Sequence, residues 1–268
     1  MEYRPLGCTD INVSLITLGT MTYGEQNTQE EAFEQMDYAF AHGVNTIDVA
    51  EMYPVPPQES TYGLSETIVG NWMADRGLRD QIVLASKVTG NGSLNPGFEY
   101  IRGGPRPSGV QIKQAVEDSL RRLQTDRIDL YQLHWPDRTT NFFGRLGYEP
   151  VENEEDIPLE ESIAALGELL KEGKIRTYGL SNETPWGVME SCRVAKALGL
   201  PSPVSIQNPY NLLNRTYEIG LAEMSVREQI GLLAYSPLAF GMLTGKYYQG
   251  ARPESCLLYT SPSPRDRG

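Results

Sequence analysis

Hydrophobic and polar positions along the chain follow two spacings that alternate. Short, almost continuously apolar runs predict strands near residues 13–19, 44–50, 81–87, 127–134, 175–181, 203–210 and 231–238. Between them, apolar residues recur at helical spacing and predict helices near residues 29–42, 63–77, 108–123, 159–173, 185–199 and 216–229. Strands of this composition are typical of parallel sheets, in which both faces are buried.

Polar residues mark where two of the predicted helices begin. Thr28 with Glu31, and Ser108 with Gln111, have the spacing of a capping box. In that motif each side chain accepts a hydrogen bond from a backbone amide that the helix leaves free. Gly43 suits the position just after the end of the first helix.

Repeated strand–helix units predict an α/β fold, and two architectures fit them. One is a (β/α)8 TIM barrel, and the other is a doubly wound open sheet. No GxGxxG motif follows the first strand, which disfavours a doubly wound dinucleotide-binding sheet. We therefore predict a barrel, with residues 1–14 as an N-terminal β-hairpin that closes its floor.

The end of the chain differs from the rest. From Cys256 the sequence reads CLLYTSPSPRDRG, without helical spacing or alternation, and we interpret residues 256–268 as a non-native or disordered tail. The barrel domain would then be residues 1–255, C-terminally truncated, with seven of the eight strands present. A barrel that lacks one strand leaves two sheet edges exposed.

Composition narrows the class of protein. The 268 residues are 40% hydrophobic, and the net charge of −12 argues against a nucleic-acid or anionic-membrane partner. No apolar run approaches the roughly 18 residues of a membrane helix, and the N-terminus lacks an apolar signal core. Three widely spaced cysteines and two histidines favour the cytoplasm and no metal site.

Four ionisable side chains stand at or just beyond the ends of three successive predicted strands. Asp48 stands at the end of the second strand with Tyr53 just beyond it, Lys87 ends the third, and His134 ends the fourth. Each also has an ordinary explanation, as a turn residue or helix cap, one of 15 tyrosines, a solvated strand end and a buried core histidine. In a barrel, however, strand ends converge on one rim, so their joint placement favours an active site.

Six motifs in a fixed order carry a resemblance to a known family. They are NTIDVAEMY, ASKV, LYQLHWPDR, GLSNET, IQNPYNLLNR and LLAYSPLAFGMLTGKY. Over roughly residues 1–255 the chain resembles the aldo-keto reductases, most closely their bacterial Tas-like, NADP(H)-dependent branch. The resemblance implies a (β/α)8 barrel and a tetrad that Asp48, Tyr53, Lys87 and His134 match.

Reduction of a carbonyl group explains these residue types. The carbon receives hydride and the oxygen receives a proton from a positioned acid, here Tyr53. A phenol has a pKa of about 10, and a neighbouring ammonium such as Lys87 is expected to lower it. Asp48 would hold Lys87 charged and oriented, and His134 would donate a hydrogen bond to the substrate oxygen.

A nicotinamide cofactor would supply the hydride, because no metal or flavin signature appears. The resemblance implies that Ser181, Asn182 and Gln207 hold its carboxamide and that Tyr235 stacks on its ring. It also implies a pyrophosphate loop that contains Ser236, Leu238, Gly241, Leu243 and Lys246. Alternatively, Ser181 and Asn182 cap a helix and Gly241 is a turn glycine. The preference for NADPH over NADH is inherited from the resemblance.

Long loops at residues 89–107 and 136–158 would shape the substrate pocket. Met21, Tyr23, Trp135 and Phe142 are the expected apolar lining. Such a lining suits aldehydes and ketones with apolar groups, without choosing among them. Oligomeric state and physiological substrate do not follow from the sequence.

Two other functions remain open at this point. The chain could be a regulatory subunit that senses a bound nucleotide, like relatives attached to potassium channels. It could also be a non-functional fragment of a longer enzyme. The absence of a partner-binding N-terminal extension favours the enzyme.

Overall fold

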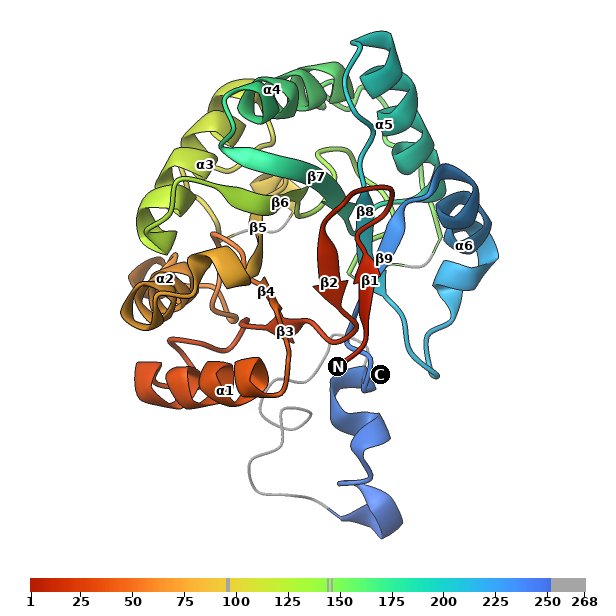
Figure 1. The fold of residues 1–268 in the computed structure, drawn as a ribbon. Coiled ribbons are helices and arrows are strands. Elements are labelled where there is room, and N and C mark those ends of the chain that lie inside the picture. The colour runs from red at the N-terminus through yellow and green to blue at the C-terminus, as the bar shows by residue number, and fades with distance from the viewer. Residues whose placement is uncertain (95–96, 144, 146, 252–268) are drawn as a thin grey trace.

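A computed structural model describes residues 1–94, 97–143, 145 and 147–251. Their main feature is a curled sheet of seven parallel strands with helices along its outer face (Figure 1). The strands are β3 (Leu18–Gly19), β4 (Thr46–Asp48), β5 (Val83–Val88), β6 (Ile128–Leu133), β7 (Ile175–Ser181), β8 (Ser205–Pro209) and β9 (Gly231–Tyr235). Each strand pairs with the next one along the chain.

Helices connect successive strands from β3 to β9. They are α1 (Gln29–Ala41), α2 (Leu64–Arg76), α3 (Gly109–Leu123), α4 (Leu159–Lys171), α5 (Pro185–Ala197) and α6 (Thr216–Glu228). Short 3-10 turns lie at Glu59–Thr61, Arg79–Gln81, Gly92–Leu94, Ala239–Thr244 and Tyr248–Gly250. This is the arrangement of a (β/α)8 TIM barrel with seven of its eight strands among the described residues, as predicted.

Packing of helix α3 shows why the sequence pattern forms these elements. Its apolar residues Val116, Leu120 and Leu123 recur at helical spacing and are buried against the sheet and its neighbouring helices. Burial of each such side chain contributes roughly 1.5–3 kcal/mol. The predicted inward face of α2, which includes Ile68 and Trp72, is buried in the same way.

The two predicted capping boxes differ in the structure. Thr28 and Glu31 form both hydrogen bonds of the motif. The hydroxyl of Ser108 accepts from the Gln111 amide, but the Gln111 side chain accepts from the backbone amide of Arg106 instead, at 3.0 Å. The second box is therefore only half formed, because the preceding loop competes for the glutamine oxygen.

The first predicted strand, residues 13–19, is divided between two sheets. Its beginning lies in β2 (Asn12–Ser14), which pairs antiparallel with β1 (Tyr3–Pro5), and its end forms β3. Leu15 and Ile16, between them, are exposed. The Ser14 amide donates to Asn45 Oδ1 at 2.7 Å, so a side chain and not the backbone of a barrel strand accepts its hydrogen bond.

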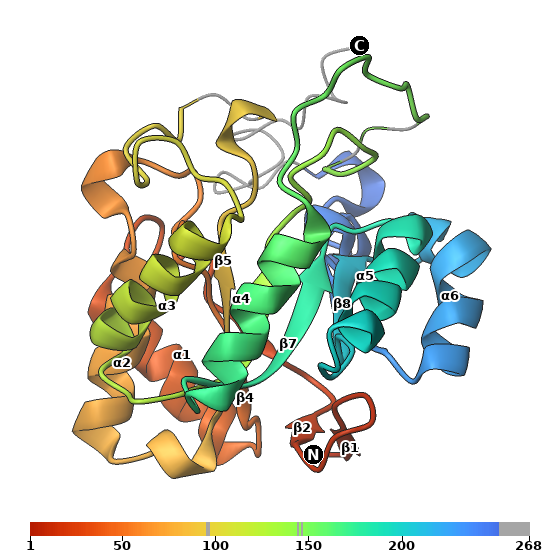
Figure 2. The same ribbon diagram turned by 90° about the horizontal axis from the view of Figure 1, so that it is seen from above.

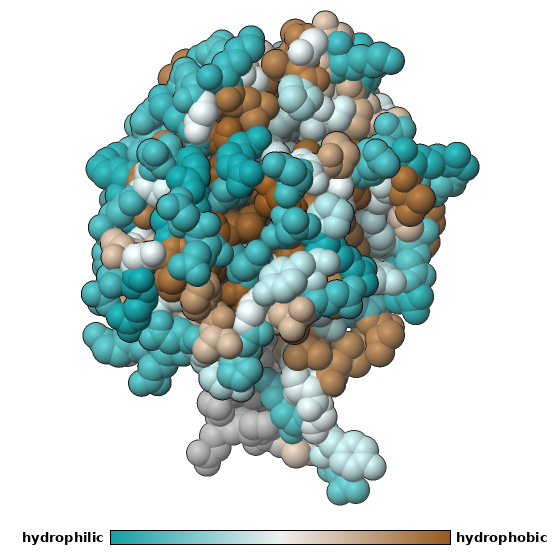
Figure 3. Space-filling view, viewed as in Figure 1, coloured by the Kyte–Doolittle hydropathy of each residue, from teal (hydrophilic) through white to brown (hydrophobic). Residues whose placement is uncertain are grey.

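The hairpin β1–β2 closes one end of the barrel, as predicted. Its residues Leu6 and Ile11 pack with Ala85, Leu130 and Val204 inside the sheet. Figure 2 shows the hairpin at the opposite end from the long loops that follow β5 and β6. Figure 3 views this end, where hydrophilic residues dominate the outer helices and hydrophobic residues appear between them.

Two further expectations concern the tail of the chain and the presence of membrane helices. Residues 256–268, the predicted tail, lie outside the described residues. Within the described ranges, no helix combines the length and the apolar character that crossing a membrane requires.

Candidate active site

The carboxyl ends of β4, β5 and β6 bring the four predicted catalytic residues together. Parallel pairing places Asp48 opposite Ala85 and Lys87 opposite Gln132. His134 follows β6, and its amide donates to Val88 O at 3.0 Å. All four predicted side chains are buried.

The ammonium of Lys87 is the centre of this group. Its Nζ donates to Asp48 Oδ2 at 2.6 Å, to Val49 O at 2.9 Å and to Tyr53 Oη at 3.3 Å. An ammonium has three N–H donors, so all of them have partners. Burial lowers the pKa of Lys87, but the carboxylate of Asp48 and the phenol of Tyr53 together raise it above its usual value. Lys87 is therefore charged at neutral pH.

Two glutamines hold the other oxygen of the Asp48 carboxylate. Gln207 Nε2 donates to Oδ1 at 2.9 Å, and Gln132 Nε2 donates to it at 3.3 Å. Gln207 was predicted to hold a cofactor carboxamide, whereas Gln132 was not predicted to take part. The available signal was its position two residues before His134, because residues two apart along an extended chain point to the same side.

The pKa of the Tyr53 phenol differs from the sequence prediction. Burial raises this pKa, and the charge of Lys87 lowers it, but the net result lies above the usual value of 10. Lys87 lowers the pKa as expected, but desolvation is the larger effect, so the net pKa is raised and not lowered. The phenol is protonated at neutral pH and can act as a proton donor.

His134 lies next to Tyr53. The two rings meet edge to face with 5.6 Å between their centroids. No described residue hydrogen-bonds to His134 Nδ1. Burial, reinforced by the charge of Lys87, holds the pKa of the imidazole well below its usual value of 6.5. A neutral imidazole keeps one N–H donor and one acceptor.

The His134 imidazole is expected to stay neutral as pH falls from 7 through 6.5, where a free histidine gains a proton. The unfolded chain binds that proton and the folded chain does not, so this residue lowers stability as pH falls. Nitrogen-15 NMR of the ring atoms measures the protonation state, and His134→Phe assigns the signals. A protonated ring at pH 7 would contradict the burial argument.

The ends of β7 and β9 bring predicted cofactor residues beside this group. Asn182 Nδ2 donates to His134 O at 2.9 Å, and Tyr235 Oη donates to Asn182 Oδ1 at 2.7 Å. Ser181 Oγ donates to Gln207 O at 2.9 Å. Thr184 caps α5, so the alternative reading of Ser181 and Asn182 as the helix cap is wrong.

The loop after β9 has an unusual backbone. Left-handed φ angles occur at Ser236, Ala239, Phe240, Gly241 and Gly245. A Cβ at Gly241 would lie 2.5 Å from Cε and 2.7 Å from Nζ of Lys246, and its φ of 92° lies in the left-handed region that favours glycine. The loop also closes on itself, because the Leu243 amide donates to Leu238 O at 3.1 Å. Mixed left- and right-handed residues are typical of loops whose amides point at an anion.

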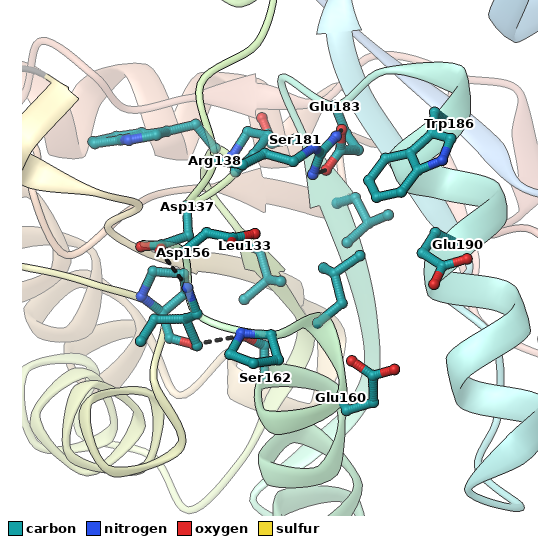
Figure 4. A pocket seen from close by; sticks show the side chains of 17 residues that line it. Leu133, Asp137, Arg138, Asp156, Glu160, Ser162, Ser181, Glu183, Trp186 and Glu190 are labelled. Carbon is teal, nitrogen blue, oxygen red and sulfur yellow. Dashed lines mark hydrogen bonds and ion pairs between the residues drawn. The ribbon is translucent and has the colours of Figure 1, made fainter. Parts of the chain in front are cut away.

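A cavity of about 260 Å³ lies beside the group, between the ends of β6 and β7 and the first turns of α4 and α5 (Figure 4). Leu133 and Leu180 contribute apolar lining, and Arg138 stacks over the exposed ring of Trp186 at 4.7 Å. Trp135, which the sequence predicts to line the substrate pocket, also lines this cavity. Among the described residues that line this cavity, the four predicted catalytic side chains are absent.

The predicted apolar lining residues are mostly buried. The Trp135 ring lies 5.1 Å from the His134 ring, and Phe143, the neighbour of Phe142, packs against Trp135 at 5.5 Å. Phe142 is itself buried, and so is Tyr23, whose burial raises the pKa of its phenol to about 12. Met21, in contrast, is 40% exposed.

Comparison with known proteins assigns the arrangement to a family. The model of the Aldo/keto reductase family matches residues 15–257. The chain belongs to the aldo/keto reductase family. It is therefore a member of an oxidoreductase family whose enzymes act on small carbonyl compounds and generally use NAD(P)H.

Individual aldo/keto reductase relatives are similar over most of the chain. Protein tas of Escherichia coli is 51% identical over 253 residues, which are 94% of this chain and 72% of that protein. The uncharacterized oxidoreductase YrpG of Bacillus subtilis is 35% identical, with 92% of this chain and 69% of its own covered. Aldo-keto reductase YhdN of the same species is 34% identical over 92% of this chain and 65% of its own.

Proposed function

We propose that this aldo/keto reductase reduces aldehydes or ketones to alcohols, with NADPH as the hydride donor. The observation that carries the proposal is the Lys87 ammonium, which donates to both Asp48 Oδ2 and Tyr53 Oη beside a neutral His134. This arrangement has a proton donor, a positive charge next to it and a neutral hydrogen-bond donor. Those are the groups that a carbonyl oxygen needs as it gains negative charge.

Tyr53 acts as the general acid in this proposal. Its phenol is protonated at neutral pH, because burial raises its pKa, and it gives its proton to the developing alkoxide. The phenolate that forms is then stabilised by Lys87, which is 3.3 Å away and charged. Asp48 keeps Lys87 charged, and the amides of Gln132 and Gln207 orient the carboxylate.

His134 would polarise the carbonyl in this proposal. A neutral ring donates one hydrogen bond to the oxygen without adding a full positive charge beside Lys87. Desolvation in the rim strengthens each of these interactions relative to water. Aromatic residues of the 136–158 loop would exclude water from the substrate side, which favours substrates with apolar groups.

The described residues fit a nicotinamide dinucleotide. When bound, the nicotinamide supplies the hydride for the carbonyl carbon. Ser181, Asn182 and Tyr235 form a connected polar group beside His134 that suits a carboxamide. The left-handed loop at residues 236–245 and the Lys246 ammonium suit the diphosphate.

Replacing Lys246 with methionine is expected to weaken NADPH binding about ten- to hundredfold, because a hydrogen bond to a charged group contributes roughly 1.5–3 kcal/mol. Titration with NADPH fluorescence measures the dissociation constant. Lys113→Met is the matched control, since Lys113 pairs with Glu168 on the outer helices. Equal affinity in both variants would remove Lys246 from the cofactor site.

The proposed function is tested by two measurements on the purified chain. NADPH binding is followed by fluorescence, and oxidation of NADPH is followed with a panel of apolar aldehydes and ketones. Binding with turnover is the expected result. Tight binding without turnover would favour a nucleotide-sensing subunit, and the absence of both would contradict the proposal for this chain. NADH in place of NADPH tests the cofactor preference.

A further inference from the structure

A second acidic residue of the segment that carries Asp48 and Tyr53 has no part in the mechanism above. Glu51 lies between them and is fully buried. Its Oε1 accepts from the Thr89 amide at 2.7 Å and from Arg102 Nη2 at 2.8 Å. Its Oε2 accepts from Arg102 Nη1 at 2.6 Å and from Tyr62 Oη at 3.0 Å. Both oxygens of this buried carboxylate therefore accept two hydrogen bonds each.

The Glu51 carboxylate is ionised and paired. Burial raises its pKa. The two hydrogen bonds and the charge of Arg102 lower it by a larger amount, so the net pKa lies below its usual value. Arg102 is enclosed to a lesser degree, with 6% of its side chain exposed. The bidentate geometry fixes both side chains in one orientation.

Glu51 joins the turn of Tyr53 to the end of β5. The Glu51 amide donates to Lys87 O at 3.2 Å, while its carboxylate accepts from Thr89, two residues beyond Lys87. The Tyr53 amide then donates to Ala50 O at 3.1 Å, which closes the turn. Main chain and side chain of Glu51 therefore both hold the turn against the strand that carries Lys87.

Arg102 connects the same turn to the loop between β5 and α3. Its backbone is left-handed, with φ of 50°, and its Nε donates to Gln111 Oε1 of α3 at 3.3 Å. The side chain thus runs from an anchored position in the loop to the turn. Residues 51 positions apart in sequence are locked together at this point.

We propose that Glu51 and Arg102 are positioning residues for proton transfer. They hold the turn at residues 50–53 against the end of β5 and so set the distance between Tyr53 Oη and Lys87 Nζ. The proposal rests on the proposed function, because it assigns these residues to the placement of the same general acid. Neither residue contacts the tetrad side chains through its own charged group, so they act through backbone position.

The chain contains a matched control for this proposal. Glu66 of α2 is also fully buried, and it pairs with Arg122 Nε at 2.7 Å and accepts from Ser86 Oγ at 2.5 Å. Its burial and its pairing resemble those of Glu51, but it lies on a helix and not in the turn of Tyr53. Loss of either carboxylate leaves a buried arginine without its partner.

The test compares Glu51→Gln with Glu66→Gln in the full chain. Glu51→Gln is expected to lower kcat per NADPH-binding site by about 10- to 100-fold, because small misplacement of a catalytic group is costly. The dissociation constant of NADPH is expected to stay near its normal value. Arg102→Lys keeps the charge but loses the bidentate geometry, and a smaller loss in kcat is expected. Glu66→Gln is expected to keep kcat close to that of the unaltered protein.

Hydrogen exchange gives a second readout that needs no activity. Amides of Val49, Glu51 and Tyr53 donate to Ala85, Lys87 and Ala50, so the peptide that contains them should be protected. Glu51→Gln is expected to speed its exchange more than Glu66→Gln does. If Glu51→Gln does not fold, Arg102→Lys takes its place in both measurements.

The outcomes separate the two proposals. Inactive unaltered protein would contradict the proposed function, and the exchange measurement would still decide whether Glu51 holds the turn. If the unaltered protein is active and Glu51→Gln has the same kcat and the same exchange as Glu66→Gln, the positioning role is overturned. Faster exchange with unchanged kcat would also overturn it, because the turn would then be loosened without an effect on proton transfer.

Discussion

Replacing Tyr53 with phenylalanine is expected to lower turnover of an aldehyde by a factor of about 10² to 10⁴. The substitution removes the phenolic proton donor and keeps the ring that packs edge to face with His134. Binding of NADPH is expected to change little, because the proposed cofactor contacts lie on β7, on β9 and in the loop that follows. Steady-state kinetics and a fluorescence titration measure the two quantities separately.

Tyr178→Phe is the control for the loss of a buried tyrosine hydroxyl. Tyr178 lies on β7 and donates to Pro201 O at 2.8 Å, which places its hydroxyl away from the rim. Its loss should affect stability slightly and turnover little. Unchanged turnover in Tyr53→Phe, with normal substrate and cofactor affinities, would remove Tyr53 from the role of acid.

Replacing Lys87 with methionine is expected to abolish most turnover and also to lower the free energy of unfolding by about 3–5 kcal/mol at pH 7. The second effect arises because the Asp48 carboxylate stays in a buried site without its cation. The pKa of Lys87 is raised in the folded state, so its stabilisation is fully present below its unfolded pKa of about 10.4. That stabilisation is lost only as pH rises through the folded pKa.

Urea denaturation of Lys87→Met and of the double variant Asp48→Asn with Lys87→Met distinguishes the two effects. The double variant removes both charges and is expected to recover much of the lost stability, but not turnover. Lys174→Met, which breaks ion pairs of a surface lysine with Glu117 and Glu172, should change both quantities little. If the double variant regains turnover, Lys87 is not needed for proton transfer.

The spacing of apolar residues was sufficient to predict most strands and helices, and its failures have definite physical causes. The strand predicted at residues 175–181 matches β7 residue for residue. The strand predicted at residues 13–19 is interrupted, because Ser14 pairs with β1 and Asn45, and only Leu18–Gly19 joins the barrel. An apolar run indicates that a segment is buried, but it does not indicate which sheet the segment joins.

The order of strands and helices, and the four ionisable residues at the strand ends, could be predicted from the sequence. This was possible because the spacing of apolar residues and the place where a strand stops are local properties. Three features became clear only in the folded protein: the partners of Asp48, the link from Glu51 to Arg102 and the direction of the Tyr53 pKa. These depend on contacts between distant segments and on burial, and in this chain desolvation of Tyr53 outweighs the charge beside it.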